Sequence, residues 1–161
     1  MKRGRGGRAK VMWAGVSVAF FDVNRPSPGG TVELASDNGD VVKQSGARVD
    51  VAGAPGGDTG KVTIRAANGM VAIAGSLQGS ATADASGARG DGGRFDLDAA
   101  TLTDFSTLNT TLNQGVFDGA RTLRVRTGDV MLAAADVVKA KEVHIAVDDG
   151  KLDVAGHIDA S

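Results

Sequence analysis

The tripeptide Arg89-Gly90-Asp91 carries the most direct chemical meaning in this sequence. A guanidinium and a carboxylate flank one glycine, which is the arrangement that integrin receptors read. The tripeptide lies in a glycine-rich segment, residues 84–93, and such segments are typical of exposed loops. We therefore take Arg89, Gly90 and Asp91 as a candidate binding site, with a solvated loop of no binding function as the alternative.

Two carboxylates, Asp96 and Asp98, are separated by one residue in an alternating segment. Residues two apart in a β-strand project from the same face, and paired carboxylates on such a face cleave glycosidic bonds in pectin-cleaving enzymes. The rest of such a site, a His-Gly pair or an Arg-x-Lys strand, is not found nearby. We therefore favour a ladder of charges on an outer face, in which Arg124 and Arg126, with the same spacing, form ion pairs.

Metal and nucleotide chemistry find little support. Residues 56–58 and 90–93 resemble calcium-binding nonapeptides only faintly, because tandem copies at nine-residue spacing are absent. His144 and His157 alternate with apolar neighbours, so we expect them to point outward as lone side chains without metal. There is no cysteine, phosphate loop or nucleophile elbow. We expect no enzyme activity, no catalytic residue, no cofactor and no metal.

An internal repeat predicts the elements that position these residues. The pattern V-x-(L/I)-x-x-x-(N/D)-G occurs in residues 32–39, again thirty residues later in 62–69, and a third time in 143–150. Self-similarity of this kind is typical of stacked architectures, in which one unit cannot bury its apolar face alone.

Alternating segments predict strands at 31–35, 40–44 and 48–52 within the first repeat, which describes one triangular coil. Similar segments recur to the end of the chain. Residues at equivalent places in successive coils would then stack in rows, such as Val32/Val62/Phe95 and Leu34/Ile64/Leu97. We predict an all-β fold, a right-handed parallel β-helix (β-solenoid) of about five coils. A β-sandwich is the rival all-β fold, but it predicts hairpins and irregular spacing.

One segment departs from the strand pattern. Its apolar residues recur at spacings of three and four, which predicts a short flanking α-helix near 104–114, capped by Asp104 or Thr103 and ended by Gly115. Residues 133–142 also have helical propensity, but we favour strand-turn-strand there. We expect positive φ at the glycines of the turn pairs, which are Gly39, Gly53, Gly69, Gly128, Gly150 and Gly156.

Composition and charge restrict the partners. Five of the 18 basic residues lie in residues 1–10, which leaves 13 basic and 19 acidic residues in the remainder. A mildly acidic body argues against nucleic acid as a partner. We divide the chain into a basic and apolar lead-in, residues 1–27, and stacked repeats, residues 28–161.

The lead-in has three interpretations. Basic residues followed by an apolar run, residues 11–21, resemble the first two parts of a signal peptide, but no small-residue cleavage site follows. An Arg-Gly arm for RNA is the second interpretation. The third, which we favour, is an ordinary lead-in to the first strands, with Trp13 as a packing residue. The apolar run is too short to span a membrane.

The repeats resemble a known family. Residues 123–130 and 143–161, with 28–32 and 49–53, resemble the repeat regions of filamentous haemagglutinin-like large exoproteins, and the resemblance covers residues 28–161. It implies a long right-handed parallel β-helix that Gram-negative bacteria secrete by a two-partner pathway through an outer-membrane transporter. The family's N-terminal secretion domain is not evident, so we expect a central piece of a longer exoprotein.

The expected function is structural: a segment at the cell surface, or secreted, that spaces or presents adhesive regions. The resemblance implies host-cell or surface receptors as partners. The last residues, 156–161, read as another strand motif without a polar cap, so we expect further repeats or self-association there. The alternative function is a carbohydrate-active β-helix enzyme.

Overall fold

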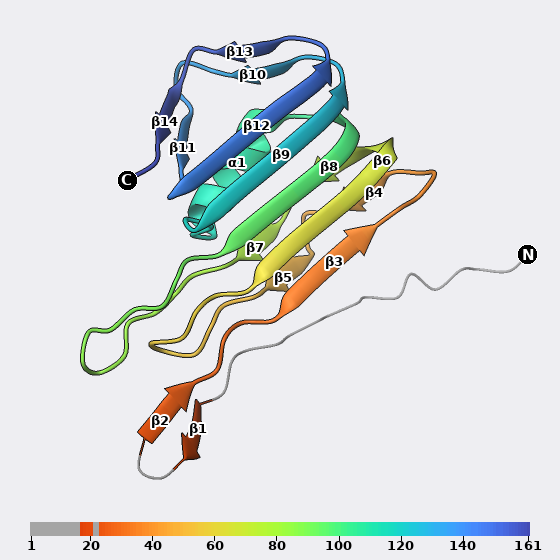
Figure 1. Cartoon of the computed structure of the whole chain (residues 1–161). Helices are drawn as coiled ribbons and strands as arrows, with labels where there is room; N and C mark the ends of the chain where they lie inside the picture. The colour runs from red at the N-terminus through yellow and green to blue at the C-terminus, as the bar shows by residue number, and fades with distance from the viewer. Residues whose placement is uncertain (1–16, 21–22) are drawn as a thin grey trace, which may run out of the picture.

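The largest sheet of the fold, which we call the main sheet, consists of parallel strands (Figure 1). The computed structural model describes residues 17–20 and 23–161. The strands lie side by side in chain order, and each neighbouring pair is parallel. They are β3 (Thr31–Ala35), β6 (Lys61–Ile73), β8 (Arg94–Leu102), β9 (Ala120–Thr127) and β12 (Glu142–Asp149). We call the stretch from the start of one of these strands to the start of the next a pass.

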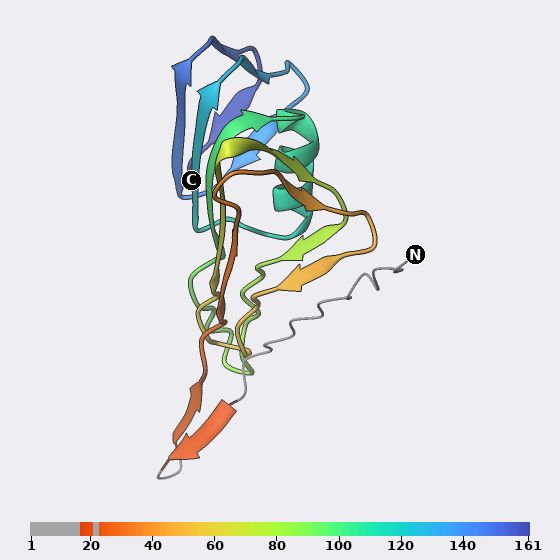
Figure 2. The same ribbon diagram turned by 90° about the vertical axis from the view of Figure 1, so that its right-hand side faces the viewer.

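Shorter strands complete the passes on one side of this main sheet (Figure 2). Each pairs in parallel with its counterpart in a neighbouring pass: β4 with β6, β5 with β7, β10 with β13 and β11 with β14. Their bounds are β4 Val41–Lys43, β5 Arg48–Asp50, β7 Ser76–Gln78, β10 Val130–Leu132, β11 Val137–Lys139, β13 Leu152–Val154 and β14 His157–Asp159. The fold is therefore mostly β, with parallel sheets and one short helix.

The predicted rows of side chains are confirmed. Val32 pairs with Val62 and Val62 with Phe95, and the second row continues through Leu123 to Ile145. The inward residues of the middle passes are almost fully buried and form one core: Val62 and Phe95 are 0% exposed. A β-sandwich is excluded by the parallel pairing.

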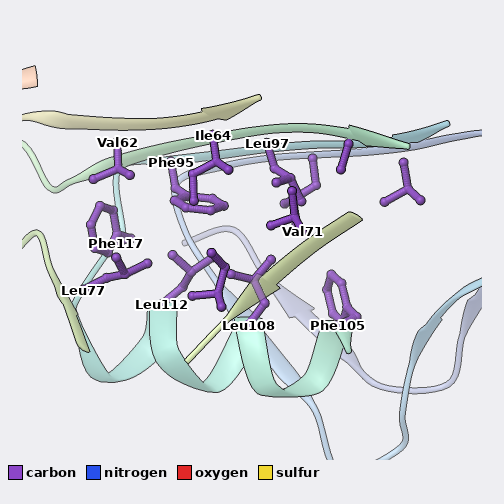
Figure 3. Packing of buried hydrophobic residues seen from close by; sticks show 14 of the residues in the cluster. Val62, Ile64, Val71, Leu77, Phe95, Leu97, Phe105, Leu108, Leu112 and Phe117 are labelled. Atoms are coloured by element: carbon purple, nitrogen blue, oxygen red, sulfur yellow. The ribbon is translucent and has the colours of Figure 1, made fainter. Parts of the chain in front are cut away.

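The helix α1 (Phe105–Gln114) takes the place of the short strands in the third pass. As predicted, the side chain of Asp104 caps it by accepting from the backbone N–H of Ser106, and Gly115 ends it. Phe105, Leu108 and Leu112 face the main sheet, opposite Val62, Ile64 and Leu97 (Figure 3). The strand-turn-strand prediction for 133–142 is also confirmed, because β10 and β11 flank the turn at residues 134–135 and β12 begins at Glu142.

Two expectations are corrected. The thirty-residue interval occurs once, because the main strands start at residues 31, 61, 94, 120 and 142 and the loops between them differ in length. Among the turn-pair glycines only Gly128 and Gly150 have positive φ. At Gly69, a Cβ would lie 2.0 Å from the carbonyl oxygen of Gly39. Glycine is needed there because two backbones approach closely, and Asn68-Gly69 lies within β6 at a bulge.

The lead-in contains an antiparallel hairpin, β1 (Ser17–Phe20) and β2 (Val23–Pro26), which lies beyond the loop end of the main sheet. The interpretations of residues 1–16, including the packing role of Trp13, fall outside the described residues. In the described part of the chain, no helix is long and apolar enough to cross a membrane.

Close stacking of the passes makes a prediction at Gly60. A Cβ at this position, just before β6, would lie 1.8 Å from the carbonyl oxygen of Gly30, which lies just before β3. Gly60→Ala should therefore lower the free energy of unfolding by about 3 kcal/mol, the upper range for overpacking. Gly46→Ala is the matched control, because nothing lies within 4 Å of its Cβ. Urea unfolding measures both, and equal stability of the two variants would contradict the stacking.

Candidate functional site

Two glycine-rich loops, residues 54–60 and 84–93, lie against each other at the loop end of the main sheet, where its strands begin (Figure 1). The backbone N–H of Thr59 donates to the carbonyl of Asp91 at 2.9 Å, and the N–H of Asp91 donates to the Asp58 carboxylate at 2.8 Å. The turn at the tip of the second loop is residues 85–87, where Gly87 has φ 85°. The tripeptide therefore lies on the returning arm of the loop.

Each member of the tripeptide has a contact within the chain. Arg89 pairs with Asp118 at 2.8 Å, and Asp91 pairs with Lys141 at 3.3 Å. Gly90 packs so closely on the neighbouring loop that a Cβ would lie 2.2 Å from the Gly57 carbonyl. Arg89 and Asp91 are nevertheless exposed, and exposed ion pairs contribute little stability. A receptor would have to displace these pairs, and binding through the tripeptide stays a prediction.

The outer face of the main sheet carries the charge ladder. Asp96 and Asp98 both point outward, as predicted: Asp96 pairs with Lys61 of the preceding pass, and Asp98 with Arg126 of the following pass. The contact between Arg126 and Asp98 has two hydrogen bonds, of 2.8 and 2.9 Å. Arg124 pairs instead with Asp148 at 2.8 Å. The ladder thus joins neighbouring passes on the solvent side.

This pairing limits the acid chemistry of the face. The hydrogen bond from Arg126 lowers the pKa of the Asp98 carboxyl, against the opposing effect of partial burial. A carboxyl group held ionised cannot serve as a general acid near neutral pH. The two aspartates border a shallow hollow of about 350 Å³, which Thr63, Thr122 and Arg124 also line. Both carboxylates beside this hollow already have cationic partners.

The two histidines are exposed, as predicted. His144 lies on the outer face of β12, and His157 on β14 at the end of the chain. Across residues 17–20 and 23–161, no group of three or more His, Cys, Asp or Glu side chains is arranged to hold a metal.

Sequence reasoning missed a buried arginine. Arg121 occupies an inward position between Phe95 and Val143 and is 1% exposed. Its guanidinium donates to the Phe117 carbonyl at 2.8 Å and to the side-chain oxygens of two helix residues, Asn109 at 3.0 Å and Asn113 at 2.9 Å.

The two asparagines also join α1 to β11, a strand of the same following pass that contains Arg121. Both donate through Nδ2 to the carbonyl of Val137 in β11. Burial lowers the pKa of Arg121 to about 10, so the guanidinium remains charged at neutral pH. The signal in the sequence is the pair of asparagines four residues apart, on the face of α1 that also carries Leu108 and Leu112. Their amides need a partner when that face is buried.

Removing Arg121 should therefore be costly. Arg121→Ala leaves the buried amide oxygen of Asn109 and the partly buried one of Asn113 without this donor and opens a cavity beside Phe95, so we expect a loss of about 3 kcal/mol or more. Arg48→Ala is the control, because Arg48 is largely exposed and its pair with Asp50 lies at the surface. Urea unfolding gives the free energies, and a loss at Arg121 no greater than at Arg48 would show that the network is dispensable.

The Asp98–Arg126 pair predicts a pH dependence. Because the folded pKa of Asp98 lies below its ordinary value of 3.8, its stabilisation is present above that value and is lost as the pH falls through the folded pKa. Asp98→Asn should lower stability at pH 7 by less than about 1 kcal/mol, since the pair is partly exposed. The difference from the unaltered chain should shrink as the pH falls below 3.8, towards and through the folded pKa. Urea titrations at pH 7 and at a series of pH values below 3.8 measure it, and Asp37→Asn controls for the loss of one exposed carboxylate.

Comparison with known proteins identifies no family. No family model matches the chain, and no curated protein and no solved structure is significantly similar to it. The resemblance to filamentous haemagglutinin-like exoproteins therefore rests on the repeat motifs alone.

Proposed function

We propose that residues 28–161 are a length of right-handed parallel β-solenoid. The support is the order of the main sheet, in which each strand pairs in parallel with the strand of the next pass. Parallel strands joined by a crossover in one sheet are right-handed in nearly all proteins, which is the reason for the proposed hand. Two further parallel sheets along the solenoid are supported by the short-strand pairs β4–β6, β5–β7, β10–β13 and β11–β14.

We infer that this solenoid is a structural segment of a secreted or surface-exposed bacterial exoprotein of the filamentous haemagglutinin-like kind. The observation that carries the inference is the row of like side chains across successive passes, because such a cross-section can be lengthened by adding passes without changing the core. A rod of this kind spaces or presents regions that adhere to host cells or surfaces. Export from a Gram-negative cell through an outer-membrane transporter belongs to the same proposal.

The loop end of the main sheet is the proposed contact region. The loops that carry Asp58 and Arg89 project from this end, and their backbone hydrogen bonds fix their relative position. Loops positioned by a rigid scaffold are where binding residues are commonly found. The sequence of these loops can therefore vary while the stacked core remains unchanged.

Retention of coated beads tests adhesion. Beads that carry the purified chain should be retained on a host-cell monolayer several-fold above uncoated beads. The double variant Arg89→Ala with Asp91→Ala should lose most of that gain if the tripeptide is the contact. The matched control is Arg48→Ala with Asp50→Ala, which removes a partly exposed Arg–Asp pair on β5, outside the two loops. Equal retention of both double variants would rule out the tripeptide, and no retention of the unaltered chain would rule out adhesion to those cells.

A carbohydrate-active enzyme remains the second candidate, because Asp96 and Asp98 border the hollow on the outer face. Incubation with an acidic polysaccharide should then lower its viscosity, and Asp96→Asn should abolish that effect. We expect no fall in viscosity, since both carboxylates are held in ion pairs. A fall that Asp96→Asn removes would replace the structural function with an enzymatic one.

A further inference from the structure

The last pass exposes side chains that are buried one pass earlier. Leu152, Val154 and Ile158 are 39%, 50% and 41% exposed. Their partners in the parallel register are Val130, Leu132 and Val138, which are 3%, 0% and 1% exposed. The positions are equivalent, so the difference arises because no further layer covers the last pass in the described chain. An apolar layer of this kind, with open strand edges beside it, favours pairing with another strand set.

The first pass has the complementary edge. Within the described residues, β3, β4 and β5 pair only with the second pass. The inward residues of the first pass, Val32, Leu34, Val41 and Val49, are only half-buried. Unpaired backbone on this edge faces away from the second pass, which is the geometry that an added parallel strand needs.

The two edges also share their spacing. Val41 follows Leu34 by seven residues, and Leu152 follows Ile145 by seven residues. The corner between the second and third strands is longer in the first pass than in the last, but corners of these two lengths already stack within the chain, where Val49 pairs with Leu77. The last pass of one copy can therefore take up the first pass of another without a change of cross-section.

We propose that a second copy of this chain stacks head to tail on the first, with β3, β4 and β5 of one copy in parallel register on β12, β13 and β14 of the other. The proposal rests on the β-solenoid proposed above. The register places Val32 on Val143, Leu34 on Ile145, Val41 on Leu152 and Val49 on Ile158. Because each added copy leaves the same two edges free, the contact does not close and the assembly grows as a filament.

The outer positions agree with this register in most places. It sets Glu33 opposite His144 and Thr31 opposite Glu142, so no like charges meet at these positions of the main sheet. Inside, Val154 meets Lys43, whose ammonium already donates to the carbonyls of Ala47 and Ala74 at 2.7 Å. Two pairs are unfavourable, because Asp50 would lie opposite Asp159 and Asp37 opposite Asp148. Like charges directly opposite weaken a sheet, so Asp159→Lys should strengthen the association.

Cysteine cross-linking tests the register, since the chain has no cysteine of its own. In the double variant Glu33→Cys with His144→Cys, the two cysteines of one copy lie four strand spacings apart, about 19 Å, which is too far for a disulfide. Between stacked copies they would lie about 4.8 Å apart. Mild oxidation should give a ladder of dimers, trimers and higher species on a non-reducing gel.

The matched control shifts the register by two residues. Thr31→Cys with His144→Cys separates the two Cα atoms by about 8 Å in the proposed contact, beyond disulfide range. It should give at least tenfold less cross-linked product. Equal ladders from both variants would overturn the register, and so would a ladder from the control alone.

Sedimentation across a concentration series tests the contact without cysteines. The unaltered chain should shift to larger species as its concentration rises, and Leu152→Lys should stay monomeric. Met131→Lys is the control, because Met131 is 59% exposed but lies one pass inward. A folded chain that remains monomeric at all concentrations overturns the proposal.

The tests also separate this inference from the proposed function. If the chain stacks but does not retain beads, the association is supported and the adhesive function is contradicted. If the chain is monomeric but retains beads, the adhesive function is supported and the association is contradicted. If Gly60→Ala were as stable as Gly46→Ala, the solenoid on which the inference rests would itself be in doubt.

Discussion

The whole arrangement depends on one constraint: inward side chains of successive passes must lie directly over one another. The constraint is visible in a repeated interval of seven residues. This interval separates the residue that each main strand contributes to the second core row from the first inward residue beyond the corner. This holds for Leu34 and Val41, Ile64 and Val71, Leu123 and Val130, and Ile145 and Leu152. The loops at the loop end of the main sheet lie outside these rows. The length of a pass can therefore vary while the core rows are kept.

The third pass shows what happens when the constraint is relaxed. Its main strand, β8, leads into α1 in place of two short strands. A helix brings no strand edges for its neighbours to pair with, so other groups must satisfy the polar atoms beside it. Arg121 and the asparagines of α1 do so, and they extend the connection to the Val137 carbonyl in the next pass. The buried charge is thus a consequence of placing a helix inside a parallel stack.

Local patterns were enough to predict the elements that repeat. Alternation gave the rows of Val32 and Leu34, and the spacing of Leu108 and Leu112 together with Asp104 gave the helix with its cap. The role of glycine could not be obtained in this way, since a turn glycine and a close-approach glycine such as Gly69 look alike in sequence. Arg121 was missed because an arginine in an alternating segment indicates the outer face. Ion-pair partners such as Asp98 and Arg126 depend on the length of intervening loops, which no local pattern fixes.

The charges on the surface follow from the same stacking. Each outward position meets the equivalent position of the next pass at strand spacing, so a sequence of like charges along a row would repel at every step. The row of Arg65, Asp98 and Arg124 alternates in sign, whereas Lys61 lies directly opposite Arg94. The ion pairs of Lys61 with Asp96 and of Asp98 with Arg126 are diagonal contacts between neighbouring passes. A ligand for this face would therefore have to replace ion pairs that already hold neighbouring passes together. A ligand for the loops would also have to displace ion pairs, those of Arg89 with Asp118 and of Asp91 with Lys141, but these pairs are more exposed and lie outside the core rows. Their loss should therefore cost less stability than the loss of the ladder.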